Sequence, residues 1–346
     1  MALRHLSATV AITAAAVVTM AGCSSDTEPE ETATAATTAG AEAAAVEETP
    51  SEEAAFPRTI THELGETVIE EQPERVVTTA LTVTGNLLAI GAPVVASAAS
   101  TPDEGLTDDL GFFAQWADVA AQEGVEVLYP NLEFDIEAVI AADPDLIIAS
   151  TTGADAAADY YDELSAIAPT VVVNYSDKTW QEVATLAGEW TGLEDQAATA
   201  IADFDARVAE VADAITVPEG SAQAVVFNNL EWDSAVAKET GAHATLLADL
   251  GFDVIEADPA LDTSDTARDD FAFVAPENLS AAFTAETLFL VNGTDTEKEA
   301  LTSTELLQEI PAVVNEQIYP LGATSFRIDY YSALDIVDTV EGYFGG

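Results

Sequence analysis

The sequence predicts an α/β protein of two Rossmann-like lobes joined by a long backbone helix, with a ligand cleft between the lobes. One chain pattern occurs twice: a strand leads into a helix, a second strand, a Glu-led helix and a third strand. Residues 177–217, which separate the two copies, show helical periodicity. A long helix between two lobes indicates a stiff strut, and two lobes of matching order that face one another form a cleft.

The first copy belongs to a lobe that we place at residues 56–176. Alternating apolar and polar residues around Gly65 predict a small hairpin at its start. A strand at 171–173 closes the lobe. The five elements of the repeated pattern lie between them, at 75–79, 85–90, 91–95, 137–142 and 145–148.

The strut and the second lobe complete the predicted fold. Apolar residues at helical spacing, Trp180 and Trp190 among them, predict that the strut helices pack through these side chains. The second lobe takes residues 218–346. Its copy of the pattern lies at 224–227, 243–250, 251–255, 277–283 and 288–291.

The N-terminus has the features of an export signal and an anchor. Residues 1–22 combine a short positive region, an apolar run and small residues before Cys23, which indicates a signal peptide. Residues 20–23 resemble a bacterial lipobox, so we expect Cys23 to be lipidated. Residues 23–55, without aromatic side chains, are expected to form a disordered acidic tether. The protein is therefore expected to be extracytoplasmic and lipid-anchored to the outer face of the cell membrane.

The charge of the chain is strongly negative. Nine Lys and Arg residues stand against 63 Asp and Glu residues, which gives a net charge of −54. Such a balance excludes nucleic acid and anionic lipid surfaces as partners. We attribute it to a salty exterior, where screening over about 8 Å weakens the repulsion between like charges.

Four segments carry a resemblance to a known family, at residues 82–94, 143–148, 166–170 and 326–333. In this order they resemble the helical-backbone class of ABC-transporter solute-binding proteins, and within it the ferric-enterobactin-binding periplasmic proteins. The resemblance implies a monomer that captures a ferric siderophore, with a catecholate favoured, and delivers it to a dimeric ABC permease. Because the siderophore holds the iron, we expect neither a cofactor nor a metal site in the protein.

Arg327 is the residue that we most expect to bind the ligand. A ferric tris-catecholate is an anion with an aromatic rim, and a guanidinium neutralises such an anion and stacks on its planes. The resemblance places Arg327, and Phe326 beside it, at the cleft wall. The alternative for Arg327 is a salt bridge with Asp329 or with another of the many acidic residues.

Further ligand contacts are expected in the first lobe. Thr82 and Thr84 follow the first strand, and α/β sheets place ligands at the carboxyl ends of their strands. Tyr129 and Asn131 precede the Glu-led helix, and their phenol and amide groups suit catechol or hydroxamate oxygens. Trp116 is expected to line the mouth of this lobe, with packing in the core as the alternative.

In the second lobe, Asn228 and Trp232 hold the place that Thr82 holds in the first. Residues 102–105 form an acidic loop without the basic residue that the family carries there. A pocket with Arg327 as its one cation favours a less charged ligand, such as a mixed catecholate or a hydroxamate complex. Lys238 or Arg268 are candidates for a second cation.

Glu137 and Glu277 open helices at equivalent places in the two lobes. A carboxylate near a helix N-terminus stabilises that helix by about 0.3–1 kcal/mol, which is the simplest role for both. The resemblance implies that each glutamate instead docks on an Arg cluster of one permease subunit.

Other functions are less well supported. Within the same class, the ligand is alternatively a hydroxamate siderophore, haem or cobalamin, with Tyr129 as a candidate haem ligand. Zinc or manganese capture is disfavoured, because only His62 and His243 remain after removal of the signal peptide. No catalytic motif supports an enzyme such as a hydrolase. A surface adhesin explains the anchor but not the duplicated lobes.

Overall fold

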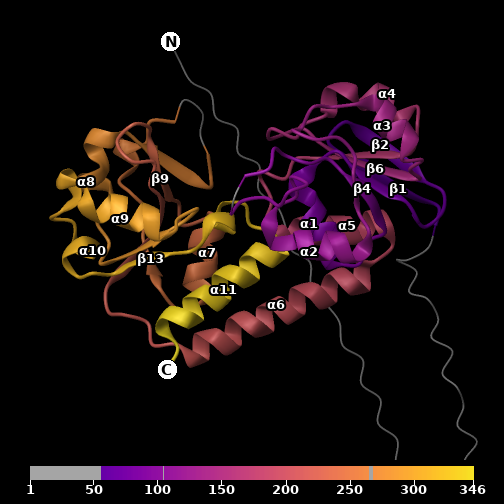
Figure 1. The fold of residues 1–346 in the computed structure, drawn as a ribbon. Helices are drawn as coiled ribbons and strands as arrows, with labels where there is room; N and C mark the ends of the chain where they lie inside the picture. Colours follow the sequence, from indigo (N-terminus) through magenta and orange to yellow (C-terminus); the bar gives the residue numbers. More distant parts are fainter. Residues whose placement is uncertain (1–55, 104, 265–267) are drawn as a thin grey trace, which may run out of the picture. The chain divides into compact units, whose positions relative to one another are not determined.

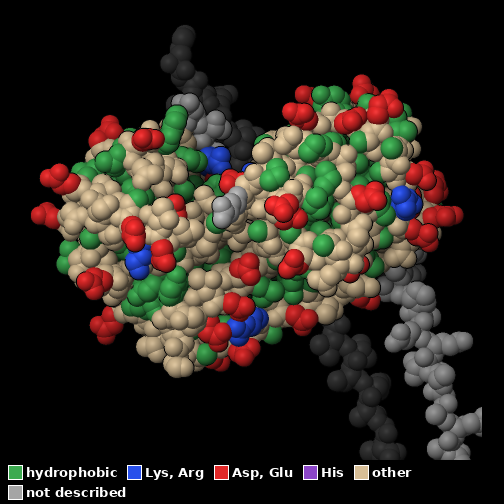
Figure 2. Space-filling model, viewed as in Figure 1, with side chains coloured by type: hydrophobic (Ala, Val, Ile, Leu, Met, Phe, Trp, Pro, Cys, Tyr) green, Lys and Arg blue, Asp and Glu red, His purple; other side chains and the backbone are tan. Residues whose placement is uncertain are grey.

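The structure is a computed structural model that describes residues 56–103, 105–264 and 268–346. The predictions for the signal peptide, for the lipidated Cys23 and for the tether lie outside these residues. Within the described ranges, no helix combines the length and apolar character needed to cross a membrane. Figure 2 shows acidic side chains spread over the face in view, with few basic ones between them.

The first lobe contains a parallel sheet of five strands in the order β5-β4-β3-β6-β7. Every residue of β6 is buried, as expected of a parallel strand covered on both faces by helices. The strands are β3 (Val76–Thr78), β4 (Val94–Ser97), β5 (Glu126–Val127), β6 (Leu146–Ser150) and β7 (Thr170–Val173). The helices are α1 (Leu81–Ala89), α2 (Ala114–Glu123), α3 (Ile136–Ala141), η2 (Ala158–Tyr160) and α4 (Tyr161–Ser165).

The predicted hairpin precedes this sheet. Its strands β1 (Arg58–His62) and β2 (Gly65–Ile69) pair antiparallel, with Gly65 in a positive-φ conformation at the turn. Two hydrogen bonds attach the hairpin to β7. The Glu63 amide donates to the Val172 carbonyl at 3.0 Å, and the Thr67 hydroxyl donates to the Thr170 carbonyl at 2.7 Å.

The second lobe contains a mixed sheet in the order β11-β9-β8-β12-β13, with β10 beside β8. Its strands are β8 (Ser221–Val226), β9 (Ser234–Ala237), β10 (Asp253–Val254), β11 (Phe271–Val274), β12 (Thr287–Leu290) and β13 (Ile318–Pro320). Its shorter helices are α7 (Ala242–Asp249), η3 (Pro259–Leu261), η4 (Pro276–Asn278), α8 (Leu279–Ala282), α9 (Asp295–Ser303), η5 (Glu305–Leu307), α10 (Pro311–Val314) and η6 (Ala323–Phe326).

The repeated pattern is present in both lobes, and the predicted fold class is confirmed, but the second copy carries an insertion. After β8 the chain turns through Asn229, which has a φ of 57°, and returns as β9 antiparallel to β8. β11 pairs antiparallel with β9 at the edge of the sheet. A tight turn after the first strand returns the chain along that strand, so the second sheet is mixed where the first is parallel.

The predicted strut consists of α5 (Trp180–Thr191) and α6 (Glu194–Ala214), with α11 (Tyr330–Phe344) beside α6 (Figure 1). A capping box of Thr179 and Glu182 starts α5, and Gly192 ends it in the left-handed conformation at a φ of 70°. The 21 residues of α6 span about 31 Å, at about 1.5 Å per residue.

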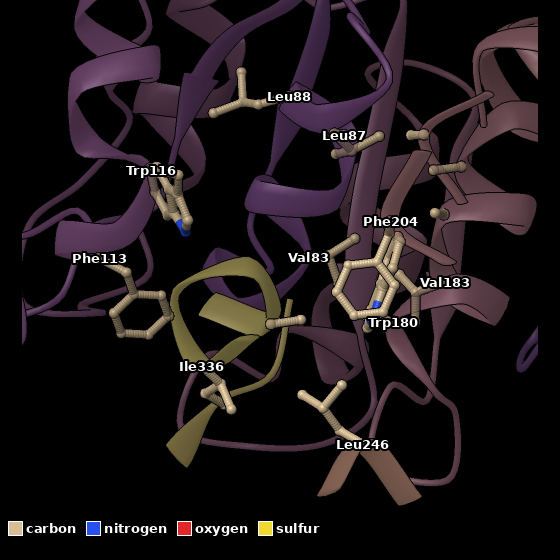
Figure 3. Close-up of a cluster of buried hydrophobic side chains, with 14 of the residues drawn as sticks. Val83, Leu87, Leu88, Phe113, Trp116, Trp180, Val183, Phe204, Leu246 and Ile336 are labelled. Carbon is tan, nitrogen blue, oxygen red and sulfur yellow. The ribbon is translucent and has the colours of Figure 1, made fainter. Parts of the chain in front are cut away.

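One hydrophobic cluster includes residues of both lobes and of the strut (Figure 3). Trp180 meets Phe204 edge to face, with ring centroids 5.0 Å apart. Val83 of α1, Leu246 of α7 and Ile336 of α11 belong to the same cluster. The two lobes and the strut therefore share a core. Full burial of each such side chain stabilises the fold by about 1.5–3 kcal/mol. As predicted, Trp180 and Trp190 are buried in it.

Asp329, at the N-cap of α11, is a buried carboxylate at the junction of α1, α2 and α11. It accepts hydrogen bonds from the Ser332 amide at 2.9 Å and from Gln115 Nε2 at 3.0 Å. A Cβ on Gly85 of α1 would lie 2.7 Å from its Oδ2, so only glycine fits at this approach. Burial raises the pKa of Asp329 to about 6, although its hydrogen bonds act in the opposite direction.

We predict that Asp329→Asn stabilises the protein relative to the wild type above pH 6. The Asp329 pKa is raised from 3.8 to about 6, so its contribution to stability is full below pH 3.8 and is lost as the pH rises through about 6. Asparagine still caps the helix but carries no charge. In urea denaturation, the difference in unfolding free energy between variant and wild type should increase by about 1–3 kcal/mol across this window.

Asp118→Asn is the matched control, because Asp118 is exposed on the same helix as Gln115. A difference between Asp329→Asn and the wild type that does not change with pH would contradict the prediction.

Candidate ligand-binding site

Three neighbouring strands of the first lobe bring polar side chains to one edge of the sheet. Thr82 follows β3, Asp155 follows β6 and Tyr175 follows β7, and these strands are parallel and adjacent. The carboxyl ends of adjacent parallel strands lie at the same edge, where α/β sheets bind ligands.

Asp155 connects these side chains. Its Oδ1 accepts from the Tyr175 hydroxyl at 2.5 Å, and its Oδ2 accepts from the Thr82 amide at 2.8 Å. Gly153, at a φ of 83°, lets the ring approach, because a Cβ there would lie 1.7 Å from the Tyr175 hydroxyl oxygen. Burial first, and then the negative charge of Asp155, raise the pKa of Tyr175 well above its usual value. Tyr175 is therefore a neutral phenol.

Arg327 reaches this edge from the second lobe. Its Nη1 donates to Thr82 Oγ1 at 3.4 Å, and its Cζ lies 5.6 Å from the centroid of the Phe113 ring. Among the described residues, no carboxylate lies within ion-pair distance of Arg327, so the alternative of a salt bridge with Asp329 is not observed. Its guanidinium remains available to an anion.

The segment before Arg327 is fixed by buried hydrogen bonds. His243 Nε2 lies 2.7 Å from the Ser325 carbonyl. Burial lowers the pKa of His243 to about 4, so the neutral imidazole donates this bond at pH 7. The Ser325 hydroxyl in turn accepts from the Asn292 amide at 2.9 Å. Phe326 is 41% exposed and stacks on Phe271 at a centroid distance of 5.8 Å.

The two other candidate cations are neutralised. Lys238 Nζ pairs with Asp262 at 3.1 Å and donates to the Arg268 carbonyl at 2.7 Å. Arg268 holds Asp270 through two hydrogen bonds, at 2.8 and 2.5 Å. Each of these cations therefore has its own carboxylate, and neither adds net positive charge.

Two predicted contacts are completely buried in the core of the first lobe. Trp116 is 0% exposed and packs against Phe112 and Phe113, so its expected place at the mouth of the lobe is wrong. Thr84 is also 0% exposed, and its hydroxyl lies 2.8 Å from that of Ser97. The chain enters α1 at Leu81, earlier than predicted, and this turns Thr84 into the core.

The remaining predicted contacts lie on loops. Tyr129 is almost fully buried beside Phe134, and its ring meets that ring at 5.7 Å. Asn131 is exposed with a φ of 57°, and its Oδ1 accepts from the Thr101 hydroxyl at 3.0 Å. Asn228 donates to the carbonyl of Asp233 at 2.8 Å and so stabilises the turn after β8.

Trp232 is 73% exposed on this turn, where an apolar indole loses contact with water only when a partner covers it.

Glu137 in the first turn of α3 and Glu277 in η4 are also exposed. A Cβ on Gly105 would lie 3.7 Å from the Ala323 Cβ of η6, so Gly105 lies close to the segment before Arg327.

Asp155 and Tyr175 were not predicted as site residues. Each follows a predicted strand, so the strand-end argument that selects Thr82 would also have selected them. Among the described residues, no group of three or more His, Cys, Asp or Glu side chains is placed to hold a metal ion.

A surface groove of about 790 Å³ lies elsewhere, between the hairpin and the strut helices. It is bordered by Glu189, Glu194 and Asp205, and Arg58 pairs there with Glu194. An acidic rim repels an anionic ligand, so this groove is less suited to an anion than the region around Arg327.

Comparisons with known proteins agree with this fold. A family model described as periplasmic binding protein matches residues 76–324. The ferric enterobactin-binding periplasmic protein FepB of Escherichia coli O6:H1 is 41% identical over 291 residues, which are 84% of this chain and 91% of that protein. The crystal structure of holo-ViuP is also 41% identical, with a TM-score of 0.77 over 84% of this chain and 96% of that one. YfiY of Bacillus subtilis, a probable siderophore-binding lipoprotein, is 30% identical over 44% of each chain.

We predict that Trp232 provides the quencher-accessible part of the tryptophan fluorescence. The other three tryptophans, Trp116, Trp180 and Trp190, are at most 4% exposed. Trp232→Phe should remove most of the quenching by acrylamide and leave the unfolding midpoint unchanged. Quenching of the variant at the wild-type level would show that another tryptophan is accessible.

Proposed function

Because this chain belongs to the periplasmic binding protein family, we propose that it captures a ferric siderophore outside the cytoplasm and delivers it to an ABC permease. The observation that carries the proposal is Arg327, a site cation without an ion-pair partner among the described residues, in a protein with a net charge of −54. Such a cation, beside the exposed Phe326 ring, suits an anion with an aromatic rim. The 41% identity to a ferric enterobactin-binding protein supports a catecholate.

The site has hydrogen-bond donors and acceptors for the same ligand. Thr82 and the neutral Tyr175 phenol lie beside Arg327, and Asn131 and Trp232 lie on the loops after β5 and β8. The Thr82 hydroxyl can donate to catecholate and hydroxamate oxygens alike. A hydroxamate complex is therefore the second candidate within this function.

Haem capture through Tyr129 is not favoured by the geometry. The Tyr129 side chain is 4% exposed, and burial, followed by the charge of Asp155, raises its pKa above the usual value. A tyrosine binds haem iron as the phenolate, which this environment disfavours. Cobalamin remains an alternative ligand for the same fold. The chain is a binding protein and not an enzyme, as its family indicates.

We also propose that the mature protein is a monomer, anchored to the outer face of the cell membrane through lipid on Cys23. The lipobox-like residues 20–23 support the anchor, and YfiY is itself named a lipoprotein. Acyl chains on a cysteine would hold the binding domain near the permease.

Arg327→Ala should weaken ferric enterobactin binding. Loss of a charge-assisted contact with an anion costs roughly ten- to a hundredfold in affinity. The measurement is quenching of tryptophan fluorescence in the soluble domain. Arg207→Ala is the control, because it removes the same charge from a surface network with Asp338 and Glu341. Equal affinities of Arg327→Ala and the wild type would remove Arg327 from the site.

Charge reversal at Glu137 and Glu277 should abolish uptake and leave ligand affinity intact. Both side chains are exposed at the start of equivalent elements in the two lobes, where a two-subunit permease can present two matching basic surfaces. Iron uptake by cells that express Glu137→Lys with Glu277→Lys is compared with siderophore affinity of the purified variant. Normal uptake would end the docking proposal, and lost affinity would move the two residues to the ligand site.

A further inference from the structure

Asp155 is a fixed negative charge inside the candidate site. The side chain is 7% exposed, and each carboxylate oxygen accepts one hydrogen bond, from the Tyr175 hydroxyl and from the Thr82 amide. The Thr82 amide lies in the first turn of α1, a helix whose N-cap residue Ala80 provides no side-chain cap. Asp155 therefore caps α1 from 73 residues away and occupies the anion-binding end of that helix.

One of the two partners of Asp155, Thr82, also contacts Arg327. Thr82 Oγ1 accepts from Arg327, and the positive charge of Arg327 acts on the Tyr175 phenol. Asp155 and Arg327 therefore both contact Thr82. Burial first, and then the charge of Asp155, raise the pKa of the Tyr129 phenol as well.

Other described charges near the site do not change this balance. Lys238 is paired with Asp262, and Arg268 is paired with Asp270. The local charge of the site is thus set by Arg327 and Asp155, one against the other.

We propose that Asp155 determines the charge specificity of the ligand site, by offsetting Arg327 so that ferric complexes of low negative charge are bound in preference to tris-catecholate trianions. This inference rests on the proposed function and names the class of ligand within it. A trianion is attracted by Arg327 and repelled by Asp155, whereas a neutral complex interacts only weakly with either charge. A hydrogen bond from the Thr82 hydroxyl is left to bind both.

The test uses the soluble domain with two probes, ferric enterobactin as the trianion and ferrichrome as a neutral hydroxamate complex. The measured quantity is the ratio of the two affinities, obtained by fluorescence quenching. Asp155→Asn should shift this ratio toward ferric enterobactin on the order of tenfold at low salt, and less at high salt, because screening weakens Coulomb interactions. Asp159→Asn, which removes the same charge at an exposed position four residues away, should leave the ratio unchanged.

Tyr175→Phe gives an independent measurement if Asp155→Asn does not fold. It removes the hydroxyl that stabilises the Asp155 charge and leaves the charge itself. The ratio should then shift in the opposite direction, toward ferrichrome. A merely structural role for Asp155 would change both affinities equally and would not move the ratio.

The outcomes separate the inference from the function on which it rests. A ratio that is unchanged in Asp155→Asn, while the wild type binds either probe, overturns the inference alone. Absence of binding of both probes by the wild type overturns the siderophore function and the inference with it. Opposite shifts in the two variants establish Asp155 as the specificity-determining residue.

Discussion

The arrangement of the protein depends on one apolar core that the lobes share with the strut. Val83 of the first lobe, Trp180 and Phe204 of the strut and Ile336 of α11 belong to the same buried cluster. Separating the lobes would expose these side chains to water, at a cost of about 1.5–3 kcal/mol for each one. The shared core therefore opposes separation of the lobes, and the chemistry of their side chains decides what binds.

Within that chemistry, positive charge is scarce. The chain has nine basic residues against 63 acidic ones, and five of the described basic side chains are held in ion pairs. Arg327 has no such pair among the described residues, and it is positioned by a hydrogen bond to Thr82 and by the Phe113 ring. In a molecule this acidic, an anion is attracted only where a cation is left without a carboxylate and the remaining charge is screened.

The sequence was sufficient for the fold class, because the repeated pattern and the helical periodicity of residues 177–217 depend on local side-chain spacing. It was not sufficient for β9, whose pairing follows from a turn at Asn229 that carries no strong hairpin signal. Within the site, Arg327 and Thr82 lie close together, whereas Thr84 and Trp116 are buried. The contact of Asp155 with Thr82 joins residues 73 positions apart, and no local pattern reports such a contact.

The cap of α11 connects stability to the site. The Ser332 hydroxyl donates to the Arg327 carbonyl at 2.8 Å and accepts from the Asp329 amide at 2.9 Å. Asp329 in turn accepts from the Ser332 amide and from Gln115 of α2, so the backbone of Arg327 is tied to the first lobe through one buried carboxylate. Burying that charge destabilises the fold, but its acceptor oxygens fix the backbone position from which the Arg327 side chain extends. A cation whose direction is set in advance loses little conformational entropy on binding, and this offsets the stability that the buried carboxylate costs.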